Sequence, residues 1–191
     1  MIAKPVPATL TIEEYFAIEA VENDRRYEYI DGEIFAMTGG TNNHSLIKLN
    51  VSGNLYRRLA GSNCSLRDSD MRVKISDSRY VYPDLSAVCG APLLEDNSTT
   101  LLNPVMAVEV TSPTSHYYDR ADKLGFYSSV PSMRVYLIID QHQVEVELHT
   151  GTEKGWLRQI YSNIDDVLVL DALGCSLPLV EVYRNIVFNR S

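Results

Sequence analysis

Two acidic side chains, Asp84 and Glu109, lie inside segments that are otherwise apolar. Asp84 is part of VYPDLSAVC and Glu109 is part of VMAVEVT. Burying an ionised carboxylate without a partner is costly, so each acid needs an explanation. Three structural explanations stay open: Asp84 caps a bend at Pro83, Glu109 pairs with a buried arginine, or either side chain sits at a solvent-facing strand end.

Taken as a pair, the two acids suggest metal chemistry. Carboxylates on neighbouring strands bind one or two Mg²⁺ or Mn²⁺ ions through oxygen and leave coordination positions open for water and phosphate. The backbone carbonyl of Val110 completes the expected ligand set of Asp84, Glu109 and Val110. The intervening segment, GAPLLEDNSTTLLNP, is read as a loop long enough to place two adjacent strands in antiparallel register.

Local signals near the N-terminus predict a helix followed by a hairpin. Thr11 and Glu14 form the pattern of a capping box, and the helix that they begin is expected to end near Val21. Asp31-Gly32 within YEYIDGEIFAM favours a type I′ turn between strands at 27–30 and 33–37.

The rest of the chain alternates between strand and helix patterns. Apolar positions up to Leu59 mark a second helix with His44 in its first turn, and a third helix is expected from near Tyr117 or Tyr118 to about Ser129. Strands are predicted at 67–75, 80–89, 103–111, 135–140, 144–149, 156–161 and 167–170, and the type of the segment at 177–183 is left open. The pattern indicates an α+β domain with a mixed central sheet that spans residues 1–191.

Composition limits the class of protein. A chain of 191 residues with 45% hydrophobic and 22% charged residues is typical of one globular domain. No signal peptide or membrane-spanning run is apparent, so a cytoplasmic location is expected. Cys64, Cys89 and Cys175 are far apart without zinc-ligand spacing, and we expect them to be reduced, buried small side chains.

The net charge of −8 argues against a large basic surface for nucleic acid. Phosphate contacts need only a local cluster of cations, and two groups in the sequence could form one. These groups are Arg57 with Arg58, and Arg67 with Arg72, Lys74 and Arg79.

The ordered motifs resemble a known nuclease family. Pro83-Asp84 followed by Glu109-Val110-Thr111 is similar to the PD-(D/E)XK signature of restriction-endonuclease-like nucleases. The wider series, YEYIDGEIFAMTGG, VYPDLSAVC, AVEVTSPTSHYYDRADKLGFY and PSMRVYLIID, resembles the Uma-type family of putative restriction endonucleases in that superfamily. The resemblance implies a restriction-endonuclease-like mixed sheet flanked by helices.

The sequence departs from the signature at one position. A lysine usually stands two residues after the second acid, and here that residue is Thr111. The resemblance implies that Lys123, on the following helix, is the catalytic lysine beside Asp84 and Glu109. The alternatives are an exposed ion pair between Asp119 and Lys123, or Lys74 as the catalytic lysine.

Two further residues have open roles. The family layout suggests Glu28 as an additional acid near the metal, and an exposed strand position explains it equally well. His44 is read either as a phosphate or water contact or as a local helix cap or packed ring.

The expected function is Mg²⁺-dependent or Mn²⁺-dependent endonucleolytic hydrolysis of DNA by a homodimer. The alternatives are a non-catalytic DNA-binding or protein-interaction module on the same fold, and a hydrolase acting on RNA or a small phosphodiester. The sequence does not identify a target sequence.

Overall fold

The computed structural model describes residues 9–22, 25–37, 40–111 and 116–188, with the side chains of 116–122 outside the description. The described helices are α1 (Ile12–Val21), α2 (Asn42–Arg58), α3 (His116–Ser129) and α4 (Leu179–Val182), with a 3₁₀ turn at Asp171–Leu173. The strands are β1 (Tyr27–Ile30), β2 (Glu33–Ala36), β3 (Cys64–Asp68), β4 (Arg72–Ser76), β5 (Arg79–Val81), β6 (Leu85–Cys89), β7 (Leu94–Glu95), β8 (Thr100–Leu101), β9 (Met106–Thr111), β10 (Val135–Asp140), β11 (Val146–Thr152), β12 (Gly155–Tyr161), β13 (Val167–Leu170) and β14 (Cys175–Pro178).

The strands form two six-stranded sheets and one two-stranded ribbon. The central sheet has the order β12-β11-β10-β9-β6-β3, and the second sheet has the order β2-β1-β5-β4-β8-β7. In the central sheet β9 pairs parallel with β10 and antiparallel with β6. The predicted α+β class with a mixed central sheet is therefore confirmed.

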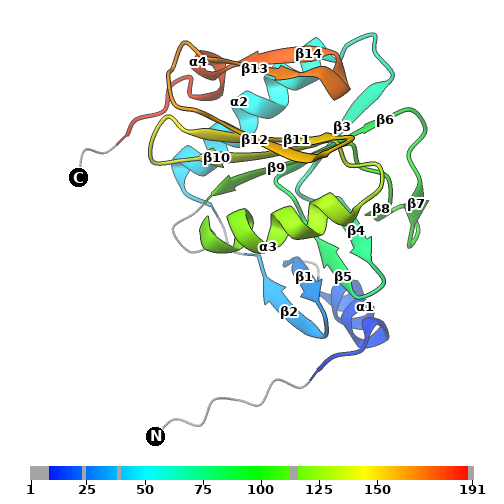
Figure 1. The fold of residues 1–191 in the computed structure, drawn as a ribbon. Helices are drawn as coiled ribbons and strands as arrows, with labels where there is room; N and C mark the ends of the chain where they lie inside the picture. Colours follow the sequence, from blue (N-terminus) through cyan, green and yellow to red (C-terminus); the bar gives the residue numbers. More distant parts are fainter. Residues whose placement is uncertain (1–8, 23–24, 38–39, 112–115, 189–191) are drawn as a thin grey trace, which may run out of the picture.

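The central sheet lies between two helical layers (Figure 1). Helix α2 and the β13-β14 ribbon pack on one face through a core that includes Val51, Leu55, Val108 and Leu177. Helix α3 and the second sheet cover the other face through Tyr127, Tyr136, Val81 and Leu101. Every residue of β9 is buried, as its nearly continuous apolar sequence predicts for a strand covered on both faces.

The N-terminal elements form as their local signals predict. The side chain of Thr11 accepts from the N–H of Glu14, and the Glu14 carboxylate accepts from the N–H of Thr11 at 2.8 Å, which completes the capping box. Asp31 and Gly32 have φ values of 49° and 97°, the left-handed region that a type I′ turn requires. Tyr15 of helix α1 packs against Tyr29 of β1 and Tyr80 of the neighbouring strand β5.

Two predicted strands are wrong in extent. The segment expected as one strand at 67–75 contains a turn after Asp68, where the N–H of Met71 donates to the Asp68 carbonyl at 3.2 Å. The segment expected at 80–89 is interrupted around Pro83, which lacks an N–H for the ladder. The two breaks let β3 and β6 join the central sheet while β4 and β5 join the second sheet. The segment that was read as a loop contains the short strands β7 and β8.

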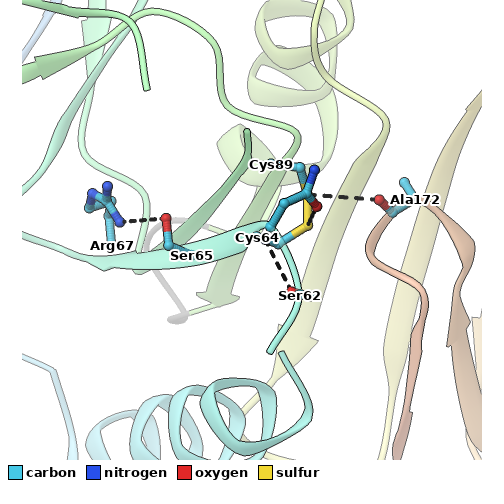
Figure 2. The surroundings of a disulfide bond; sticks show 7 residues. Ser62, Cys64, Ser65, Arg67, Cys89 and Ala172 are labelled. Atoms are coloured by element: carbon cyan, nitrogen blue, oxygen red, sulfur yellow. Dashed lines mark hydrogen bonds between the residues drawn. A yellow bond between two sulfur atoms is a disulfide. The ribbon is translucent and has the colours of Figure 1, made fainter. Parts of the chain in front are cut away.

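The expectation that all cysteines are reduced and buried is corrected. Cys64 of β3 and Cys89 of β6 are directly paired across the ladder and joined by a disulfide, as Figure 2 shows. Both residues and the free Cys175 are partly exposed. The pairing depends on strand register between segments far apart in sequence, which cysteine spacing alone does not reveal.

In the part of the chain that the structure describes, no helix is both long enough and apolar enough to cross a membrane.

Candidate active site

Asp84 lies just before β6, and Glu109 lies on the neighbouring strand β9. Leu85 of β6 pairs with Val108 of β9, the residue before Glu109. The N–H of Val110 donates to Oδ2 of Asp84 at 2.8 Å. Asp84, just before β6, is therefore tied to the backbone of β9 beside Glu109, while the two carboxylates contact different helices.

Glu109 is held by two groups from α3. The ammonium of Lys123 lies 2.8 Å from Oε1 of Glu109, and the hydroxyl of Tyr127 donates to the same oxygen at 2.9 Å. Lys123 and Tyr127 are four residues apart and so share one helical face. Burial, and then the charge of Glu109, raises the pKa of Tyr127 well above its ordinary value, so its hydroxyl remains a donor.

Lys123 also contacts Glu28, which comes from the second sheet. Its Nζ lies 2.9 Å from Oε1 of Glu28, and the N–H of Tyr82 donates to that oxygen at 3.2 Å. Lys123 is only 5% exposed and Glu28 only 6%. The reading of Lys123 as a surface lysine, and of Glu28 as an exposed strand residue, is therefore wrong.

Asp84 is held by a second pair of helical side chains. His44 Nε2 lies 3.1 Å from Oδ2 of Asp84, and Lys48 Nζ lies 3.3 Å from Oδ1. These residues are also four apart, on α2. Burial tends to raise the pKa of Asp84, but the hydrogen bond and charge of His44, the Val110 N–H and the charge of Lys48 outweigh it. The pKa of Asp84 therefore lies below its ordinary value, and the carboxylate is ionised at neutral pH.

The ligand chemistry of this site fits Mg²⁺ or Mn²⁺. Asp84 and Glu109 present hard oxygen donors at neighbouring positions, and the chain follows Glu109 with the carbonyl of Val110. Within the described residues, no three His, Cys, Asp or Glu side chains form a metal-binding cluster; the acids pair with lysines and a histidine instead. A metal ion bound by Asp84 would therefore replace the contacts that His44 and Lys48 make with this carboxylate.

The other candidates lie in different surroundings. Thr111, at the usual lysine position, donates from its hydroxyl to the Ile139 carbonyl at 3.4 Å. Lys74 lies on β4 and pairs with Asp77 at 3.0 Å and Glu95 at 3.3 Å. The side chain of Asp119, the proposed surface partner of Lys123, lies outside the described residues.

Sequence reasoning missed Lys48, which contacts the carboxylate of Asp84. Its ammonium also donates to the Ser69 hydroxyl at 3.0 Å, in the turn between β3 and β4. The spacing of four residues from His44 was a usable signal, since both side chains project from one helical face. Without a known position for Asp84, however, nothing distinguished Lys48 from an ordinary surface lysine.

Comparisons with known proteins agree with this architecture. The sequence model of the Uma2 family, described as "Putative restriction endonuclease", matches residues 12–180. An uncharacterized protein of Synechocystis sp., slr1290, is 33% identical over 181 residues, which is 94% of this chain and 94% of the relative. A second uncharacterized protein of that organism, sll1609, is 33% identical over 151 residues, or 78% of this chain and 85% of the relative.

A solved structure shares the fold. It is the crystal structure of "a putative nuclease belonging to DUF820" from Anabaena variabilis, with a TM-score of 0.72 over 87% of this chain and 94% of that chain. The sequence identity is 15%, so this likeness supports the arrangement of elements and not the chemistry.

Proposed function

The chain belongs to the Uma2 family of putative restriction endonucleases, and on that basis we propose that it is a metal-dependent endonuclease that hydrolyses phosphodiester bonds in DNA. Two observations support the proposal: Lys123 pairs with the buried carboxylates of Glu109 and Glu28, and the buried Asp84 accepts the backbone N–H of Val110, the residue after Glu109. Burying two acids and an amine from three separate elements costs folding free energy, and such groups cluster at functional sites.

Each residue has a definite task in this proposal. Asp84 and Glu109 hold Mg²⁺ or Mn²⁺, which when bound polarises the phosphate and lowers the pKa of a water. Tyr127 fixes the orientation of Glu109 by donating to Oε1. Lys123, held between Glu28 and Glu109, orients the attacking water and offsets negative charge that develops on the phosphate.

Cleavage of plasmid DNA by the purified chain tests the proposal. With Mg²⁺ present, Asp84→Asn and Lys123→Met are each expected to reduce the rate by at least about 100-fold. Glu147→Gln is the matched control, because Glu147 is a carboxylate only 2% exposed that pairs with Arg158 at 2.6 Å. Parental rates in both site variants, or an equal loss in the control, would contradict the assignment.

A second candidate is a non-catalytic DNA-binding or protein-interaction module on the same fold. The net charge of −8 favours it, because the chain as a whole repels a polyanion. Calorimetric titration with Mn²⁺ separates the two functions. A metal site predicts stoichiometric binding that Glu109→Gln abolishes, whereas a purely structural network predicts no such binding.

A homodimer is part of the same proposal, since cutting both strands of a duplex calls for two sites. Size-exclusion chromatography with light scattering, with and without DNA, measures the mass directly. A monomer of 21.5 kDa in both conditions would exclude this part of the proposal.

A further inference from the structure

The two lysines that contact the acids differ in how tightly they are held. The side chain of Lys123 is 6% exposed and pairs with both Glu28 and Glu109. The side chain of Lys48 is 28% exposed and, among the residues that the structure describes, pairs with the Asp84 carboxylate and the Ser69 hydroxyl. Lys48 is therefore the amine nearest to solvent and the one most easily redirected.

The two oxygens of Asp84 have different partners. Oδ2 accepts from the Val110 N–H and contacts His44, while Oδ1 contacts Lys48 at 3.3 Å. A cation bound by this carboxylate repels the nearby ammonium and neutralises the charge that attracts it. The Lys48 ammonium then remains hydrogen-bonded to Ser69 beside the site and can pair with another anion.

Resting on the proposed function, we propose that Lys48 binds a phosphate of the DNA backbone next to the cleavage position. The ammonium changes partner from Asp84 to the phosphate when the acids hold a metal ion. Ser69 fixes the amine through its hydroxyl, and helix α2 supplies a rigid base for the side chain. Lys48 thus acts in substrate binding, while Lys123 remains the amine of the buried cluster.

The salt dependence of DNA affinity tests this role. Each phosphate neutralised by a side chain contributes about 0.9 to the slope of log Kd against log salt for duplex DNA. The binding of a short fluorescent duplex is measured by anisotropy in Ca²⁺, a hard cation with similar oxygen preference, between about 50 and 200 mM salt. A gel at the end of each titration checks that the duplex is intact.

Lys48→Met is expected to weaken binding and to reduce the slope by about 0.9. Lys48→Arg keeps the charge and is expected to retain the parental slope. Lys154→Met is the control, because Lys154 is an exposed lysine in the β11-β12 turn at the other end of the sheet. Thermal denaturation of each variant establishes that the chains compared are folded.

The outcomes separate this inference from the proposed function. An unchanged slope in folded Lys48→Met overturns the role of Lys48, even where the parental chain cleaves DNA. A reduced slope without any cleavage in Mg²⁺ upholds Lys48 and overturns the catalytic proposal. A parental chain that binds no DNA in Ca²⁺ overturns both.

Discussion

The carboxylate of Asp84 accepts the backbone N–H of Val110, so the residue just before β6 is bonded to the peptide that follows Glu109 in β9. This hydrogen bond ties the side chain of Asp84 to the backbone of β9 next to Glu109. Each acid is then contacted by side chains four residues apart on a different helix, His44 and Lys48 of α2 for Asp84. Changes at either acid are therefore expected to affect the other, and their energetic effects should not be additive.

Replacing Lys123 is expected to destabilise the fold strongly. Lys123→Met leaves Glu28 and Glu109 buried without their shared cation, and breaking a buried ion pair costs about 3 to 5 kcal/mol. Urea denaturation at neutral pH measures the free energy of unfolding. Lys154→Met, at an exposed position, should change it by less than about 0.5 kcal/mol. Equal stabilities for the two variants would contradict the buried network.

Removing the hydroxyl of Tyr127 should have a smaller effect. Tyr127→Phe keeps the ring in the core and takes away one donor to the Glu109 carboxylate, so a loss of about 1 to 3 kcal/mol is expected. The same denaturation measurement applies. Tyr56→Phe is a suitable control because Tyr56 is 74% exposed. A stability equal to that of the parental chain would show that the hydroxyl contributes nothing.

Stability should fall on mild acidification because of His149. Burial lowers its pKa below the ordinary value of 6.5, despite the nearby Glu147, with Arg158 lowering it further. Below about 6.5 the unfolded chain binds a proton that the folded chain does not, so unfolding becomes easier as pH falls toward the folded pKa.

Denaturation curves between pH 7.5 and 5.5 measure this effect, with the range chosen to span the ordinary histidine pKa of about 6.5. His149→Phe preserves a ring against Tyr136 and should flatten the dependence. His142→Gln, at an exposed histidine, should leave it as in the parental chain. The same slope in all three chains would refute the assignment to His149.

The disulfide predicts a redox-dependent stability. Cys64–Cys89 closes a loop with a sequence separation of 25, for which loop-closure entropy gives about 3.5 kcal/mol. Dithiothreitol should lower the denaturation midpoint of the parental chain and have no effect on Cys64→Ser/Cys89→Ser. Mass spectrometry after alkylation counts free thiols independently. Three alkylated cysteines in the untreated, air-oxidised chain would exclude the bond.

The elements with local signals could be predicted from the sequence. The capping box at Thr11, the Asp31-Gly32 turn and the apolar run of β9 each depend on residues close together in the chain. The break at Pro83 was missed because apolar residues continue on both sides of it, whereas the break after Asp68 lies in the polar run Arg67-Asp68-Ser69-Asp70, a turn signal that the sequence analysis did not use. The division of strands between two sheets follows from non-local pairing, which residue patterns do not encode directly.

The site was predictable in outline. The acids stood out because ionised groups are rare in buried strands, and the resemblance pointed to Lys123. The burial of Glu28 required knowledge that β1 lies against α3, and Lys48 required the position of Asp84. Cys64 and Cys89 likewise become partners only through the β3-β6 register.

The two carboxylate partners of Lys123 belong to different sheets, with Glu28 in β1 and Glu109 in β9. The ammonium of Lys123 therefore links a strand of the second sheet to a strand of the central sheet, alongside the packing of Arg79 of β5 over the Phe126 ring of α3. A shift of one sheet against the other would lengthen at least one of the two ion pairs, so we expect the position of the N-terminal hairpin and that of the Glu109 carboxylate to be coupled.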